Sequence, residues 1–370
     1  MEISQFLNLM VEKQASDLFF STGAPVNIKI EGITHPLQMH TLAPGEIKQL
    51  AYSLMSQKQI AEFEAKLEMN MAISATGIGR FRINIFLQRG ETGMVIRYIK
   101  SKIPPLAALG LPPSLERLIM LKRGLILVTG ATGSGKSTTL AAMINHRNEQ
   151  ATGHILTIED PLEFIHEHKH SIVDQREVGL DTLSYEEALK NALREAPDVI
   201  MIGEIRDLAT MQQALNYAET GHLCLSTLHA NNANQAIERI INFFPDTARH
   251  QLLLDLSINL AGIISQRLIP GLHQKLVPAV EVMLQSPYIS DLISKGDISS
   301  IKEAMSRSND LGMCTFDQAL YQLFKEGRIS QQEALQNADS HTDLALRMRL
   351  EGGVETSATD KALHQLSIDE

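Results

Sequence analysis

The pattern of hydrophobic and polar residues predicts a small mixed sheet domain in residues 1–102. An amphipathic helix opens the chain, and residues 80–87 read as a strand because Phe81, Ile83 and Ile85 alternate with polar neighbours. Further strands are expected at residues 17–20, 26–30, 69–75 and 94–99, and helical structure at 44–66. The alternation leaves one face of this sheet basic.

Two proline pairs separate this domain from the rest of the chain. Residues 103–113 contain Pro104-Pro105 and Pro112-Pro113, which cannot continue a helix or a central strand. We therefore expect an interdomain linker at 103–113 and a second domain over 114–350. Residues 351–370 are small and polar, and they predict a disordered tail.

Beyond the linker, short apolar runs alternate with helical segments. The runs are residues 125–129, 154–158, 199–203 and 223–227. This alternation is typical of a parallel sheet covered by helices on both faces. Ser184 and Glu187 predict a capping box that starts one covering helix. Amphipathic helices are also expected at 247–269 and 287–336, with a strand at 276–283 between them.

Composition and charge limit the classes of function. Of the 370 residues, 44% are hydrophobic and 21% are charged, which is typical of a soluble globular protein. The net charge of −10 argues against a general nucleic-acid binder. Cys224 and Cys314 are the only cysteines, so no disulfide framework or zinc cluster is expected. No run approaches the roughly 20 apolar residues that span a bilayer, and we expect a cytoplasmic protein without direct membrane insertion.

Residues 130–137 read GATGSGKS and match the phosphate loop G-x-x-x-x-G-K-[ST]. A strand that feeds a glycine-rich turn and then a helix directs backbone N–H groups at phosphate oxygens. Lys136 is expected to neutralise phosphate charge and Ser137 to ligate Mg²⁺. The sequence thus predicts ATP with Mg²⁺, bound by Gly130, Thr132, Gly133, Ser134, Gly135, Lys136, Ser137 and Thr138.

Carboxylates at the ends of two predicted strands are candidates for the hydrolytic chemistry. Glu204 follows the apolar run 199–203, where a carboxylate would polarise the attacking water. Gly203 replaces the aspartate that usually precedes such a glutamate, which suggests that another acid shares the metal. Glu159 and Glu163 are the candidates for ordering metal or water, while Asp160 is equally well explained as a turn residue before proline.

Histidines and arginines are further candidates. His222 and His229 bracket the strand run 223–227, where each is either a structural residue or a sensor of the γ-phosphate. The basic face of the first domain offers arginines that are either solvated or able to meet charge on the γ-phosphate. These are Arg80, Arg82, Arg89 and Arg97.

Taken in order, these motifs resemble those of bacterial secretion ATPases of the type IV pilus branch, the PilT/PilU family of retraction motors. The motifs are residues 130–138, 157–164, 203–207 and 220–229. The resemblance implies a PAS-like α+β domain followed by a RecA-like α/β domain, assembled as a homo-hexamer with ATP at domain and subunit boundaries. It also implies roles for single residues. Glu204 would be the catalytic carboxylate, Glu163 would assist it, His229 would sense the γ-phosphate, and Arg82 and Arg97 would match the family's paired arginines.

Two features narrow the resemblance to retraction ATPases. The chain shows neither the long extra N-terminal region nor the four-cysteine zinc site of extension and type II secretion ATPases. PilT members carry the box Ala-Ile-Arg-Asn-Leu-Ile-Arg-Glu, and residues 288–295 of this chain differ from it. This difference makes the chain more similar to the accessory PilU branch. The expected function is a motor for pilus retraction and twitching motility, in which hydrolysis drives interdomain closure. It would act on an inner-membrane platform protein, beside a companion ATPase. The alternatives are a nucleotide-gated accessory scaffold and a small-molecule kinase.

Overall fold

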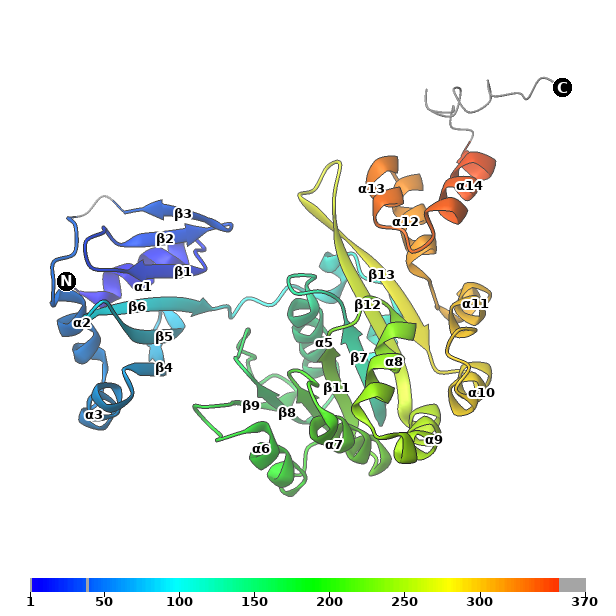
Figure 1. Ribbon diagram of the computed structural model, residues 1–370, viewed down its shortest axis with the longest axis horizontal. Coiled ribbons are helices and arrows are strands. Elements are labelled where there is room, and N and C mark those ends of the chain that lie inside the picture. Colours follow the sequence, from blue (N-terminus) through cyan, green and yellow to red (C-terminus); the bar gives the residue numbers. More distant parts are fainter. Residues whose placement is uncertain (1, 38–39, 353–370) are drawn as a thin grey trace. The chain divides into compact units, whose positions relative to one another are not determined.

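The computed structural model describes residues 2–37 and 40–352, and these fold into two compact units (Figure 1). One unit contains the residues up to 103 together with 156–196, and the other contains 104–155 together with the residues from 197 on. The boundaries expected at 102, 113 and 350 stay predictions. Residues 353–370 of the predicted tail lie outside the described residues.

The N-terminal region is built on a six-stranded antiparallel sheet with the strand order β3-β2-β1-β6-β5-β4. The strands are β1 (Asp17–Phe20), β2 (Asn27–Ile30), β3 (Ile33–Pro36), β4 (Glu68–Ala75), β5 (Gly79–Gln88) and β6 (Glu91–Ile99). The helices are α1 (Ile3–Glu12), α2 (Glu46–Leu54) and α3 (Gln57–Lys66). The alternation predicted at 80–87 is confirmed, because Phe81, Ile83 and Ile85 are fully buried on one face of β5.

The helical structure predicted at 44–66 is confirmed, and it is divided into α2 and α3 with an extended residue, Met55, between them. Ser56 caps α3 in a capping box with Gln59, in which each side chain bonds the other residue's backbone N–H. This reciprocal bonding satisfies donors that a continuous helix would have paired internally, and so it favours a new helix start.

The second sheet has seven strands in the order β13-β12-β7-β11-β10-β8-β9. The strands are β7 (Gly124–Thr129), β8 (Gly153–Glu159), β9 (Ser171–Glu177), β10 (Val199–Ile202), β11 (Leu223–Leu228), β12 (Leu260–Pro270) and β13 (Leu276–Leu284). β10, β11, β7 and β12 pair in parallel, and β13 closes the edge antiparallel to β12. The predicted apolar runs are confirmed as strands, and every residue of β7, β10 and β11 is buried.

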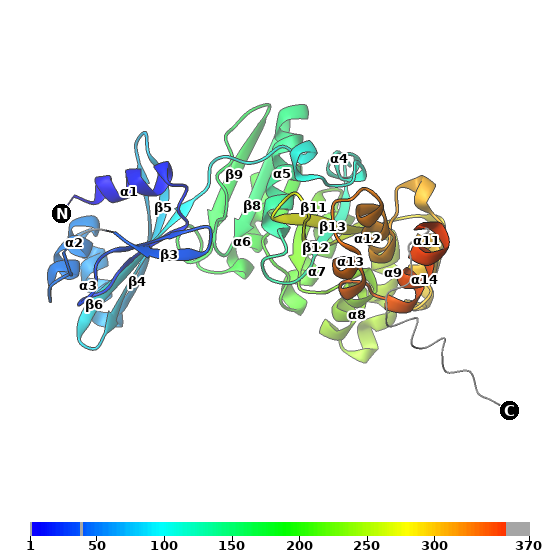
Figure 2. The ribbon, with the colours of Figure 1, turned by 90° about the horizontal axis from the view of Figure 1, so that it is seen from above.

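Helices cover this sheet and extend the chain to residue 352 (Figure 2). They are α4 (Ser114–Ile119), α5 (Lys136–Gln150), α6 (Tyr185–Ala192), α7 (Leu208–Glu219), α8 (Ala233–Phe243), α9 (Arg249–Asn259), α10 (Pro287–Lys295), α11 (Ile301–Ser306), α12 (Phe316–Lys325), α13 (Gln331–Gln336) and α14 (His341–Gly352). Ser184 caps α6 as predicted, accepting the Glu187 N–H at 3.2 Å. Among the described residues, no helix is both long and apolar enough to cross a bilayer.

The helix predicted at 247–269 is wrong in its second half. α9 ends at Asn259, and the apolar run that follows is β12, which pairs with β7 on one side and β13 on the other. A buried strand and a buried helix show the same hydrophobic run, so only the two neighbouring strands decide between them. The strands β3 and β9 were not predicted, because β3 is wholly exposed and β9 is rich in polar residues.

The C-terminal helices α12, α13 and α14 lie beside one another and pack on the end of the β12–β13 hairpin (Figures 1 and 2). Their shared core joins strand residues to helix residues. It contains Ile269, Val277, Ala279, Phe316, Leu320, Tyr321, Leu323, Ile329, Ala334, Leu344 and Met348. This core fixes the last described helices to the sheet that carries the phosphate loop.

Candidate nucleotide site

The phosphate loop connects β7 to α5, and its shape depends on glycine. Gly130 has φ 147° and Gly135 has φ 90°, conformations that residues with a Cβ rarely adopt. A Cβ at Gly130 would lie 2.5 Å from the carbonyl oxygen of Gln266, and one at Gly135 would lie 2.7 Å from its side-chain nitrogen. Gln266 on β12 therefore supports the loop from behind, and Gly133, at the exposed turn, has φ 80°.

Lys136 is buried at the start of α5, with its ammonium group turned back under the loop. Its Nζ donates to the carbonyl oxygens of Gly130 at 2.8 Å and Ala131 at 2.9 Å. Burial lowers the pKa of Lys136, and the negative charge of Glu204 opposes that shift. An ammonium group has three N–H donors, so these two bonds leave one for a phosphate oxygen.

The first five residues of the loop, 130–134, line an open cleft of about 270 Å³. Thr132 and Gly133 are exposed, Ser137 is exposed and Thr138 is half-buried at the start of α5. The Ser134 hydroxyl is buried and has no hydrogen-bond partner in the protein. A buried polar atom without a partner costs free energy, which a bound phosphate group can relieve. The cleft is lined by Gly130, Ala131, Thr132, Gly133, Ser134, Asn231, Gln266, Arg267, Leu268 and Asn337.

Glu204 lies where β10 ends, and its carboxylate is held by a histidine and an arginine. His229 Nε2 is 3.0 Å from Oε1, and Arg206 Nε donates to Oε2 at 2.8 Å. The Thr227 hydroxyl donates to the Gly203 carbonyl at 2.7 Å and so fixes the backbone before Glu204. The predicted residues Glu204, His229 and Lys136 therefore belong to one electrostatic group, and Arg206 was missed although it lies in the same motif.

The two histidines that bracket β11 have different surroundings. Strand register places Leu228 beside Thr129, next to the phosphate loop, and Leu223 beside Gly124 at the opposite end of β7. His229 follows the first pair and contacts Glu204. His222 precedes the other pair, and its Nδ1 lies 3.1 Å from the Thr220 hydroxyl and 3.3 Å from the Tyr217 carbonyl oxygen. His222 therefore contacts its own turn, at the end of β7 opposite the phosphate loop.

The acids at the end of β8 and just after it differ in exposure. Glu159 is only 9% exposed and accepts hydrogen bonds from the Thr157 hydroxyl at 2.8 Å and the Gln175 amide at 3.4 Å. Burial raises the pKa of Glu159 to about 7, against the lowering effect of these bonds. Glu163 is exposed. The predicted roles of Glu159 and Glu163 at the metal or water stay predictions.

The predicted arginine pair lies on adjacent strands of the N-terminal sheet. Arg82 on β5 stands directly opposite Arg97 on β6, and Arg97 stands opposite Asp17 on β1. Arg97 Nε donates to Asp17 Oδ1 at 2.7 Å, and Arg82 Nε is 3.7 Å from Glu177 Oε1. Each of the two adjacent like charges thus has its own carboxylate.

The other two arginines are placed differently. Arg80 lies two residues before Arg82 on the same face of β5, and its Nε is buried. Arg89 occupies the turn between β5 and β6 with φ 51°. Arg89 therefore lies apart from the pair.

The protein side chains available to bind a metal are consistent with a magnesium ion that is held mainly by the nucleotide. Within residues 2–37 and 40–352, no three His, Cys, Asp or Glu side chains converge to hold a metal ion. Magnesium at phosphate-transfer sites uses one or two protein oxygens together with substrate phosphates and water. The exposed Ser137 hydroxyl at the start of α5 fits that mode of binding.

Comparison with known proteins agrees with the fold and the motifs. Residues 2–347 match the family model described as type II/IV secretion system protein. The chain is 52% identical over 359 residues to the type IV pilus ATPase PilU of Pseudomonas aeruginosa, covering 97% of this chain and 94% of that protein. It is 41% identical over 338 residues to the retraction ATPase PilT of the same organism, covering 91% and 98%.

A solved structure gives the same result for the fold. The crystal structure of the pilus retraction motor PilT with bound ADP superposes with a TM-score of 0.87 at 41% identity, covering 93% of this chain and 98% of that one. This agreement confirms the predicted fold class, an N-terminal antiparallel sheet domain and a mostly parallel second sheet. The chain thus has the fold of a secretion-system ATPase. The chain belongs to the type II/IV secretion system family, and within it to the type IV pilus ATPases of the PilT/PilU family.

Replacing Glu159 by Gln should flatten the pH dependence of stability. The folded protein keeps a proton on Glu159 up to about pH 7, whereas the unfolded chain releases it near pH 4.5. The unfolding free energy of the wild type therefore falls as the pH rises through this window. The fall should exceed that of Glu159→Gln by about 2 to 3 kcal/mol between pH 5 and pH 8.

Urea denaturation at several pH values, without nucleotide or metal, measures this difference. Glu219→Gln is the matched control, because Glu219 is an exposed residue at the end of α7 and its replacement should leave the wild-type pH dependence in place. Parallel curves for the wild type and Glu159→Gln would contradict the shifted pKa.

Proposed function

We propose that this protein is a Mg²⁺-dependent ATPase that drives type IV pilus retraction, and with it twitching motility, as a homo-hexamer. The observation that carries this proposal is the group formed by Glu204, His229 and Lys136. A carboxylate at a strand end, 3.0 Å from a histidine and electrostatically coupled to the phosphate-loop lysine, is suited to ATP hydrolysis. The names of its relatives, a pilus ATPase and a retraction ATPase, support the biological role.

In this proposal Glu204 accepts a proton from the water that attacks the γ-phosphorus, while the bond to the ADP oxygen breaks. Lys136 and the loop N–H groups stabilise charge on the phosphate oxygens. His229 orients Glu204 and senses the γ-phosphate. Ser137 and Glu159 would hold Mg²⁺, which supplies charge neutralisation when bound, and Glu163 would assist in ordering water.

Arg82 and Arg97 complete the proposed catalytic set. Their pairing with Glu177 and Asp17 keeps the two guanidinium groups on one face of the N-terminal sheet. Arginines that meet the charge developing on a transferred phosphoryl group accelerate the reaction strongly. We infer that closure about the linker 103–113 brings this face to ATP, so that binding and hydrolysis alternate closed and open states.

The proposed motor works at the cytoplasmic face of the inner membrane, on a platform protein of the pilus machine and beside a companion retraction ATPase. The nucleotide-gated scaffold remains the alternative role, because Arg206 and His229 both hold the Glu204 carboxylate. A carboxylate held in this way is a weaker base. A small-molecule kinase is the third candidate, and it would not require a ring.

Glu204→Ala should lower the turnover of ATP on the order of 10²- to 10⁴-fold, because the general base is lost. Binding of ATP should persist in that variant, whereas Lys136→Ala should lose it. A coupled ATPase assay and nucleotide titration on the purified full chain measure both effects. Glu62→Ala is the control, since Glu62 is an exposed residue of α3 that pairs with Lys66.

The same preparations separate the three candidate functions. Wild-type protein that binds ATP as a ring of about six chains but does not hydrolyse it would support the scaffold. A monomer or dimer by light scattering would support the kinase. Undiminished turnover by Glu204→Ala would remove Glu204 from the mechanism.

Arg82→Ala should reduce turnover by about 10³-fold, as loss of an arginine finger does, with much less effect on the affinity for ATP. Single-turnover kinetics separate the two quantities. Arg89→Ala provides a matched loss of charge in the adjacent turn, and it should retain activity. Equal effects of the two substitutions would mean that the basic face acts only through its net charge.

A further inference from the structure

Arg267 is a cation on the wall of the nucleotide cleft that the motifs do not include. It lies on β12 next to Gln266, the residue that supports the phosphate loop. Its side chain is 25% exposed, and the cleft it lines is bounded on the other side by residues 130–134. A guanidinium group at this place is suited to an anionic ligand such as the phosphates of a nucleotide.

The direction of the Arg267 side chain is fixed by several contacts. Nη1 donates to the Asn337 carbonyl at 2.6 Å, and Nη2 donates to Asp339 Oδ1 at 2.7 Å and the Asn231 carbonyl at 3.3 Å. The guanidinium carbon also lies 3.9 Å from the centre of the Phe316 ring. Because a guanidinium group has five N–H donors, these contacts orient it without using all of its donors.

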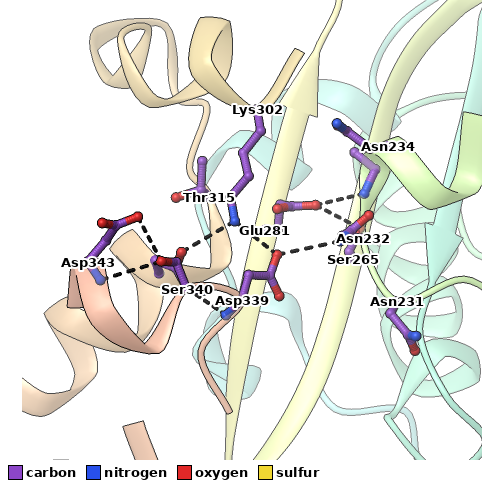
Figure 3. Close-up of polar contacts among 12 residues, drawn as sticks. Asn231, Asn232, Asn234, Ser265, Glu281, Lys302, Thr315, Asp339, Ser340 and Asp343 are labelled. Carbon is purple, nitrogen blue, oxygen red and sulfur yellow. Dashed lines mark hydrogen bonds and ion pairs between the residues drawn. The ribbon is translucent and has the colours of Figure 1, made fainter. Parts of the chain in front are cut away.

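Asp339 is the point where this wall meets the C-terminal helices. Besides Arg267, it accepts from Lys302 Nζ at 3.2 Å and from the Asn232 amide at 3.5 Å (Figure 3). Its own backbone N–H donates to Asp317 at 2.8 Å. Burial raises the pKa of Asp339, but the bonds and charges of Arg267 and Lys302 outweigh this effect and lower it. Asp339 therefore carries a negative charge between α13 and α14.

The strand that carries Arg267 is itself held firmly to the phosphate-loop strand. The Thr129 hydroxyl, immediately before Gly130, donates to the Ser265 hydroxyl at 3.0 Å, and Ser265 donates to Glu281 at 3.3 Å. Glu281 also accepts the Ala233 N–H at 2.8 Å, at the start of α8 (Figure 3). These bonds fix β12, the phosphate loop and α8 as one frame, so Arg267 has a defined position beside the loop.

From this geometry we propose that Arg267 contacts the bound nucleotide and that Asp339 is its positioning residue. The inference rests on the proposed function, since it assumes that the cleft binds ATP. Filling the cleft would then place phosphate oxygens beside the guanidinium donors that Asp339, Asn337 and Asn231 leave free. Because Asp339 also holds α11 through Lys302 and α12 through Asp317, nucleotide occupancy is coupled to the C-terminal helices.

If the role of Arg267 is purely structural, its replacement is expected to have a different effect on nucleotide binding. In that case Arg267 would only attach residues 337–339 to the sheet, as Lys302 does from the other side of Asp339. Lys302 contacts Asp317 and Asp339 but does not line the phosphate-loop cleft. It is therefore a matched control that loses a contact of the same kind without touching the nucleotide.

The test is the dissociation constant of a fluorescent N-methylanthraniloyl-ATP with Mg²⁺, measured on the full chain below the melting temperature of every variant. Arg267→Gln should raise the dissociation constant about tenfold or more, because a charge-assisted contact is lost. Asp339→Asn should raise it by a smaller factor, and the double variant should not exceed Arg267→Gln alone. Lys302→Gln should leave it unchanged, even where it lowers the melting temperature.

Hydrogen exchange gives a second readout. Nucleotide should change the protection of α12–α14 in the wild type and in Lys302→Gln, but not in Arg267→Gln. If Arg267→Gln does not fold, Arg267→Lys serves instead, because it keeps the charge but loses the two-pronged contact with Asn337 and Asp339. It is expected to give an intermediate rise.

Equal dissociation constants for the wild type and the Arg267 variants, or equal losses in the Arg267 and Lys302 variants, would overturn the inference. Wild-type protein that fails to bind the probe would overturn the proposed function instead, so the two failures are distinguishable.

Discussion

The site depends on the register of three parallel strands. β7 is central, and it pairs with β11 so that Leu228 lies beside Thr129, and with β12 so that Ser265 lies beside the same residue. β7 and β11 therefore end at one level of the sheet, and β12 continues past that level to Pro270. The phosphate loop and His229 follow the two strand ends, and Gln266 and Arg267 lie beside them on β12. A shift of one residue in either pairing would turn the supporting side chains to the opposite face.

The arrangement of these strands explains why the phosphate loop requires glycines. Gly130 and Gly135 are required partly by their φ angles and partly because Gln266 approaches closer than any side chain allows. Gln266 in turn accepts a hydrogen bond from the Thr139 hydroxyl on α5 at 2.7 Å. The loop is thus held between a strand and its own helix. This support keeps N–H donors and Lys136 in place before a nucleotide arrives, which is the preorganisation that phosphate binding and catalysis require.

Much of this site could be predicted from the sequence because it is encoded locally. A phosphate loop, a carboxylate after a buried run and a histidine after the next run each depend on neighbours in the chain, and they allowed Gly130, Glu204 and His229 to be selected. Arg267 and Gln266 could not be found in this way. They lie in a run that was predicted to be helical. In a helix, nothing would relate the positions of these two side chains to the phosphate loop. Only the pairing of β12 with β7 and β13 makes them part of the cleft.

Charge balance explains how such a site can respond to its ligand. Without nucleotide, each cation near the candidate site has an acceptor within the chain: Lys136 has loop carbonyls, Arg206 has Glu204, and Arg267 has Asp339. Arg82 and Arg97 likewise have Glu177 and Asp17 in the N-terminal unit. The acceptors of Arg206 and Arg267 are carboxylates, and Asp339 is bonded in turn to Lys302 and Asp317. A triphosphate bound beside these cations changes the charge around them, and bonds of this kind can transmit nucleotide binding to the rest of the fold.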